Sequence, residues 1–75
     1  MRELEEVILE ADEVEAIRLA DQLNLSQEEA AIKMEISRAT FGRIVNKARN
    51  KIASGILSGK AIRIDDKNFN NNLVE

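Results

Sequence analysis

The sequence predicts a mainly α fold, a three-helix domain that contains a helix-turn-helix and a short two-stranded β pairing of its N- and C-terminal segments. Three observations predict it. Apolar residues recur at helical spacing along three segments, each segment opens with an N-cap pattern, and short β-branched runs flank them. The predicted helices cover residues 12–23, 26–34 and 38–57, and the predicted strands cover residues 7–9 and 61–64.

The first helix is predicted to begin at Asp12, because Asp12 and Glu15 have the spacing of a capping box. It is expected to run to about Leu23 and to stop at Asn24, a residue that tolerates a positive φ. Its buried stripe is predicted to comprise Val14, Ile17, Leu19, Ala20 and Leu23, with Glu13, Arg18 and Asp21 facing outward.

The second helix starts at Ser26, where Ser26 and Glu29 form an S-x-x-E capping box, and ends near Met34. Only Glu35 and Ile36 separate it from the next N-cap, Ser37, which is the spacing of a helix-turn-helix corner. The inner face of this motif is predicted to comprise Ala31, Ile36, Phe41 and Ile44. At the turn itself, glycine is usual because φ tends to be positive, so Glu35 departs from the pattern.

The third helix should extend from Arg38 to about Leu57 and end at Gly59. Its inner side is predicted to comprise Phe41, Ile44, Val45, Ala48 and Ile52. Its outer side should carry Ala39, Thr40, Arg43, Asn46, Lys47, Asn50 and Lys51. Three of these outer residues are cations at i, i+4 and i+8, and they repel one another in the free protein.

The chain has room for one domain, predicted to span residues 1–64 and to be followed by a disordered polar tail, residues 65–75, with possible docking of Phe69. Because a single strand cannot stand alone, the strand at 61–64 should pair with that at 7–9, either within the chain or between two subunits.

Cysteine, histidine, tryptophan, tyrosine and proline are absent from the 75 residues. Disulfides, thiolate or imidazole metal sites and histidine proton shuttles are therefore excluded, and we expect no enzyme, no metal and no cofactor. The segment from Gly55 to Lys60 has the wrong length and context for a phosphate loop. No apolar run is long enough to span a bilayer, so the expectation is a soluble cytoplasmic protein without membrane contact.

Charge is distributed very unevenly along the chain. Residues 1–36 contain three cations and eleven acids, whereas residues 37–64 contain seven cations and no acid. A field polarised in this way steers an anion toward one face of a protein whose net charge is only -3. The alternative is that the two halves neutralise each other across the fold or a dimer.

Five segments within residues 7–64 have a distinctive sequence: DEVEAIRLAD, SQEEAA, SRATFGRI, AR-x-KIA and GKAIRI. Together they resemble a small prokaryotic family of uncharacterised, predicted DNA-binding proteins. The helix-turn-helix of that family is similar to region 4 of RNA polymerase sigma factors. Family members usually carry Pro at the position of Ala39 and Gly at that of Glu35, and a longer basic N-terminal extension that this chain lacks.

The predicted DNA-binding residues are Ser37, Arg38, Ala39, Thr40, Arg43, Asn46, Lys47, Asn50 and Lys51. The first four occupy the N-terminal end of the third helix, where free amides meet phosphates or base edges. Arg43 and Asn46 suit guanine and adenine by bidentate geometry, whereas Lys47, Arg49 and Lys51 are expected to contact phosphate.

The sequence therefore predicts a sequence-specific binder of double-stranded DNA, a transcriptional regulator whose recognition helix, residues 38–57, enters the major groove. A homodimer is expected, since the core is small and the strands need closure. The alternative is a protein-protein adaptor that docks on RNA polymerase or a partner regulator without touching DNA.

Overall fold

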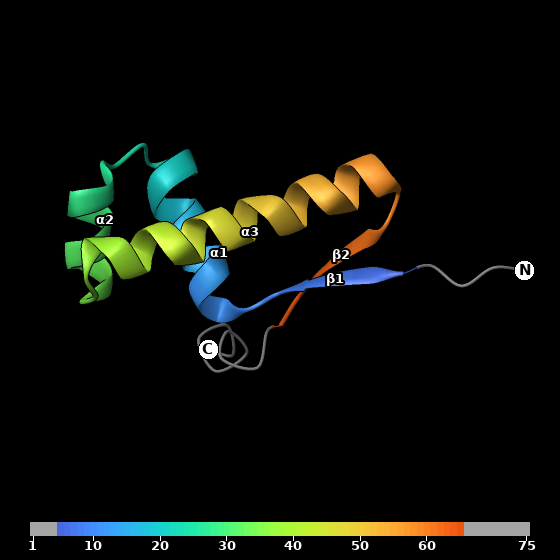
Figure 1. Ribbon diagram of the computed structural model, residues 1–75, viewed down its shortest axis with the longest axis horizontal. Coiled ribbons are helices and arrows are strands. Elements are labelled where there is room, and N and C mark those ends of the chain that lie inside the picture. The colour runs from blue at the N-terminus through green and yellow to red at the C-terminus, as the bar shows by residue number, and fades with distance from the viewer. Residues whose placement is uncertain (1–4, 66–75) are drawn as a thin grey trace, which may run out of the picture.

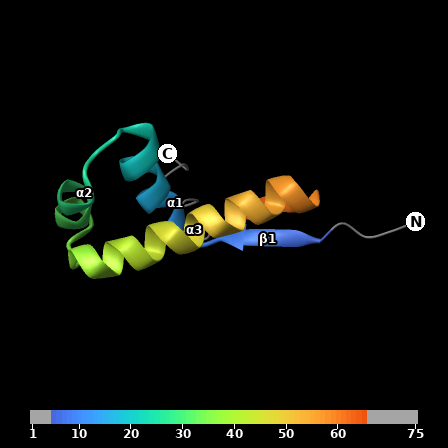
Figure 2. The same ribbon diagram turned by 45° about the horizontal axis from the view of Figure 1, so that its top comes forward.

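The computed structural model describes residues 5–65 and is mainly helical, with a small two-stranded sheet. The long helix α3 forms the axis of the molecule. In both views α2 lies at one end of α3 and strand β1 near the other (Figure 1, Figure 2). The elements in order are β1 (Glu6–Leu9), α1 (Ala11–Ile17), the π-helical turn η1 (Arg18–Gln22), α2 (Gln27–Met34), α3 (Arg38–Ser58) and β2 (Ala61–Ile64).

The start of α1 differs from the prediction. The N-cap is Glu10, not Asp12, and Glu13 supplies the reciprocal carboxylate, accepting a hydrogen bond from the Glu10 N–H at 2.8 Å. Strand β1 ends at Leu9, so only one residue separates strand from helix, and the helix begins at once. The expectation that Glu13 faces outward is also wrong, because its side chain is buried against α3.

A second error concerns Leu23, at the end of this helical segment. The predicted burial of Leu23 is wrong, because Leu23 is 48% exposed. Through η1 the backbone bonds span five residues, as in Leu23 N–H to Arg18 O at 2.9 Å, and the extra residue in the turn rotates the next residues about the helix axis. Leu25 packs against the core instead. The predicted left-handed stop at Asn24 is confirmed by its φ of 61°.

The boundaries of α2 and of the turn after it are confirmed. Ser26 and Glu29 form the predicted capping box, with the Glu29 N–H donating to Ser26 Oγ at 3.1 Å. Glu35 has a φ of 61°, the left-handed conformation expected at this turn. Ser37 then caps α3 by accepting from the Thr40 N–H at 3.0 Å.

The core lies where α1, η1 and α2 cover the N-terminal half of α3. Phe41, Val45 and Ala48 are fully buried on α3, and Leu19 of η1 belongs to the same core cluster as Phe41 and Val45. The small buried side chains of the other helices, such as Ala31, allow α2 to cross α3 closely. The predicted inner side of α3 is therefore confirmed for these residues. Helix α3 ends at Ser58, one residue later than expected, with Gly59 in the left-handed conformation.

The two strands pair within the chain and run parallel, with Val7 opposite Ile62 and Leu9 opposite Ile64. They lie against the C-terminal half of α3, where a Cβ atom on Gly55 would come within 2.7 Å of Ile62 Cγ1. Glycine at this position is thus what lets helix and sheet approach. The N–H of Asp65 extends the ladder to Leu9 O at 2.8 Å, whereas the predicted disordered tail beyond it and the docking of Phe69 lie outside the described residues.

Candidate functional site

An exposed polar face runs along the N-terminal half of α3. Five residues form it, each three or four positions from another and therefore adjacent on the helix surface. We call this the open face; it comprises Ala39, Arg43, Asn46, Lys47 and Asn50, all of which are exposed. Four of the five can offer hydrogen bonds to a ligand, and two carry positive charge.

The start of α3 adjoins the open face. The Ser37 hydroxyl accepts from the Thr40 N–H and donates to Thr40 Oγ1 at 2.8 Å, so the two hydroxyls are held together at the helix N-terminus. Arg38 is exposed, and its Nε lies 3.7 Å from Glu28 Oε2, a long contact between two solvated side chains. These groups sit where the helix dipole favours an anion.

Arg43 and Lys47 are the two cations of α3 that form no ion pair with any residue between 5 and 65. Together with Ile44 they line an open hollow whose opposite wall is the start of α1, including Glu10 and Asp12. The acids set a boundary on one flank of the open face, because a bound polyanion would be repelled by them. Arg43 and Lys47 thus border these acids on one flank, and their other flank is open to a ligand.

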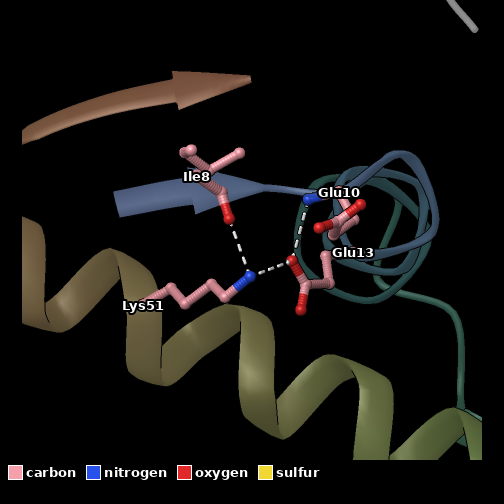
Figure 3. A network of polar contacts seen from close by, with 4 residues as sticks. All are labelled: Ile8, Glu10, Glu13 and Lys51. Carbon is pink, nitrogen blue, oxygen red and sulfur yellow. Dashed lines mark hydrogen bonds and ion pairs between the residues drawn. The ribbon is translucent and has the colours of Figure 1, made fainter. Parts of the chain in front are cut away.

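Lys51 was expected to join this row, but the structure places it elsewhere. Its Nζ donates to Ile8 O at 2.7 Å and to Glu13 Oε1 at 2.8 Å, which fastens α3 to both β1 and α1 (Figure 3). Only 23% of the Lys51 side chain and 4% of that of Glu13 are exposed. Lys51 is therefore part of the internal architecture and does not project outward with Arg43 and Lys47.

The carboxylate of Glu13 remains charged in this buried position. Burial raises the pKa of Glu13, but the hydrogen bonds from Lys51 and the Glu10 N–H and the positive charges of Lys51 and Lys47 together hold the pKa below its ordinary value. Sequence reasoning missed this role, although one signal was present: Glu13 lies three residues before the fully buried Ala16 and so falls on the buried stripe of α1.

The side chain of Arg49 is also paired with an acidic residue. Its guanidinium forms a two-point pair with Asp21 of η1, with Nη2–Oδ1 at 2.7 Å and Nε–Oδ2 at 3.1 Å. The hydrogen bond from Arg49 lowers the pKa of Asp21, and the same bond raises the pKa of Arg49. Both side chains are 44% exposed, so the pair is solvated, but the arginine is no longer a free phosphate ligand.

A metal-holding group and a membrane-spanning helix are both absent from the described part of the chain. Residues 5–65 contain no group of three or more acidic side chains placed to hold a metal ion. None of the helices described there is both long enough and apolar enough to cross a membrane.

Comparison with known proteins places the chain among bacterial relatives. A UPF0251 protein of Moorella thermoacetica is 54% identical over 65 residues, which are 87% of this chain and 44% of the relative. One from a Thermoanaerobacter species is 52% identical over 69 residues, covering 92% and 61%. One from Clostridium tetani is 48% identical over 73 residues, covering 97% and 50%. The chain thus spans about half the length of the curated relatives it matches.

No solved structure matches the chain. The model of one protein family matches residues 1–72, nearly the whole sequence. The chain therefore belongs to the family described as "Protein of unknown function DUF134".

Proposed function

We propose that this protein binds double-stranded DNA in a sequence-specific manner and acts as a transcriptional regulator, with α2, the turn and α3 working as a helix-turn-helix similar to region 4 of sigma factors. The observation that carries the proposal is the open face of α3. Arg43 and Lys47 are exposed there and unpaired within residues 5–65, whereas Arg49 and Lys51 are held by acids of the same chain.

The shape of the unit suits the major groove, which accepts one α-helix. Three residues, 35–37, separate α2 from α3, so the two helices meet at a corner that leaves one face of α3 uncovered. In this arrangement α2 lies across the DNA backbone and the N-terminal half of α3 lies in the groove.

Each residue of the proposed interface has a distinct role. Arg43 reads guanine and Asn46 reads adenine, because each side chain can make two hydrogen bonds to its base edge. Lys47 and the N-terminus of α3, from Ser37 to Thr40, contact phosphates and set the register without reading sequence. Asn50 extends the polar surface toward the groove rim. Lys51 takes no part in this interface, because its ammonium already has two partners.

Selection of bound sequences from a random pool of duplexes tests the proposal. We expect enrichment of a defined sequence, and loss of its preferred bases when Arg43 and Asn46 are both replaced by alanine. A pool that shows no enrichment over several rounds would contradict sequence-specific binding.

The alternative function is that of a protein-protein adaptor, and one feature of α2 favours it. Ile32 is 75% exposed and lies beside a shallow hollow lined by Leu25, Glu29 and Lys33. An apolar side chain in this setting suits a protein partner such as RNA polymerase. If Ile32→Asp abolishes regulation in cells while Arg43→Ala has no effect, the adaptor is the correct assignment.

A further inference from the structure

The two edges of the small sheet are not equivalent. On β1 the outward-facing carbonyl of Ile8 is taken by the ammonium group of Lys51 at 2.7 Å (Figure 3). A lysine side chain laid over a strand edge prevents another strand from pairing there. The outer edge of β1 is therefore closed by the protein's own α3.

The outer edge of β2 is open among the described residues. The N–H groups of Ala61 and Asp65 donate to Glu5 O and Leu9 O of the β1 side. Because backbone groups alternate in direction along a strand, Ile62 and Ile64 direct their N–H and C=O groups away from β1. Within residues 5–65 the sheet has two strands, so no third strand of that part meets these groups.

Exposed apolar side chains lie on this strand and on the helix that leads into it. In α3, Ile56 directly follows Gly55, the residue that faces the sheet, and is 68% exposed. On β2 itself, Ile62 is 41% and Ile64 is 45% exposed. Parallel sheets are normally covered on both faces, so a two-stranded one with this much open apolar surface is incomplete alone.

The basic side chains near the outer edge of β2 form ion pairs with acidic residues of the same chain. Lys60 Nζ lies 3.5 Å from Glu5 Oε1, and Arg63 Nε lies 3.1 Å from Glu6 Oε1. Two identical surfaces of this kind can meet without net repulsion, unlike the cationic open face at the other half of α3.

We propose that two copies of this chain associate through the outer edges of β2, which pair antiparallel to form a continuous four-stranded sheet. A two-fold axis through this pairing brings the same patch of both copies together. The register is set by charge and by side-chain direction. When Ile62 of one copy lies opposite Ile62 of the other, Ala61 lies opposite Arg63. A register shifted by one residue in each copy would place the two Arg63 side chains opposite each other, and their like charges would repel.

This association requires no DNA, so experiments on the protein alone test it. Sedimentation of the 75-residue chain from micromolar to millimolar concentration should show a monomer–dimer equilibrium. Ile64→Pro removes an outward N–H but leaves the β1–β2 ladder intact, and Ile64→Ala removes the side chain but keeps the N–H. We expect dimerisation of Ile64→Pro to be about tenfold weaker than that of Ile64→Ala, because symmetry removes two hydrogen bonds at once.

Ile56→Lys provides a second variant that leaves the backbone unchanged and should also weaken association, since residue 56 lies beside Gly55 and is exposed, so the fold tolerates its replacement. Circular dichroism checks that each variant is folded. A chain that stays monomeric at millimolar concentration would overturn the proposal, as would a dimer that neither Ile64→Pro nor Ile56→Lys weakens.

Hydrogen exchange identifies what covers the edge. The amides of Ile62 and Ile64 should gain protection as the protein concentration rises. Protection that is strong and independent of concentration would mean that the chain's own terminal residues cover β2, and the proposed interface would then be wrong.

Discussion

Arg43 and Lys47 lie on the same helix as Arg49 and Lys51, two to eight residues away, yet the two pairs have different surroundings. The first pair is exposed and lacks an acidic partner within residues 5–65, while Asp21 holds Arg49 and Glu13 holds Lys51. The difference shows that the number of cations in a stretch of sequence is not the number of cations that a ligand can contact. Acids from the N-terminal third of the chain neutralise the second half of α3 and leave the first half charged.

Substitutions in the two regions of α3 should also have different effects, one on folding and the other on binding. Lys51 and Glu13 connect α1, β1 and α3, so their removal affects folding. Arg43 and Lys47 repel each other at i, i+4 and contribute little to stability, so their removal should affect binding alone.

The largest expected effect is on folding. Glu13→Ala leaves the ammonium of Lys51 without its carboxylate and removes the acceptor of the Glu10 N–H, and we expect a loss of about 3 kcal/mol in the free energy of unfolding. Urea denaturation followed by circular dichroism measures it. The control is Glu15→Ala, which breaks the exposed pair with Arg18 and should cost less than about 1 kcal/mol. Equal losses in the two variants would contradict a structural role for the buried pair.

The next effect concerns base recognition. Arg43→Ala should weaken binding to the selected duplex by about 1–3 kcal/mol and relax the preference at one base position. Arg43→Lys keeps the charge but loses the two-point hydrogen bond, so it should retain affinity for random duplexes and lose the preference. Fluorescence anisotropy with matched and mismatched duplexes distinguishes these outcomes. If both variants discriminate like the unmodified protein, Arg43 does not lie in the groove.

A smaller effect is expected from Lys47→Ala, because a phosphate contact adds affinity without sequence information. Binding to matched and random duplexes should weaken by a similar factor. Arg49→Ala is the comparison variant, since Arg49 is bound to Asp21, and it should weaken binding less than Lys47→Ala. The opposite order would show that the ion pair opens when DNA binds.

Local features of the fold were predictable from the sequence, and long-range ones were not. The helix starts at Ser26 and Ser37 could be predicted because a cap depends on residues three positions apart. The pairing of Lys51 with Glu13 joins residues 38 positions apart, and no local pattern reports it. The exposure of Leu23 results from a π turn that the apolar spacing did not reveal.

The residues of the candidate site also fall into those that local spacing predicts and those that only the tertiary structure explains. The exposure of Arg43, Asn46 and Lys47 agrees with their helical spacing, whereas the withdrawal of Arg49 and Lys51 depends on which acids the fold brings across α3. Amphipathic periodicity defines a face of a helix, but only the tertiary structure determines which charges on that face are free.

The smallest effect is a dependence of stability on pH. The pKa of Asp21 is lowered by its bond to Arg49, so the folded protein holds this carboxylate ionised more readily than the unfolded chain does. The resulting stabilisation is present above the ordinary carboxyl pKa of about 4 and is lost as the pH falls through the lowered value. For a pair this exposed, Asp21→Asn should cost about 0.5 kcal/mol at neutral pH and less in strong acid, as measured by thermal unfolding. A cost that grows on acidification would contradict the assigned pair.

The affinity of the protein for duplex DNA as a function of salt concentration tests the central claim most directly. If the open face of α3 contacts phosphates, the logarithm of the association constant should fall linearly with the logarithm of salt concentration, with a slope of magnitude about 2 or more. Replacing Arg43 and Lys47 together by alanine should reduce that slope by at least about 1, because Lys47 is the proposed phosphate contact and Arg43 reads a base. An affinity that is nearly independent of salt, or a slope that the double variant leaves unchanged, would contradict DNA binding through the open face.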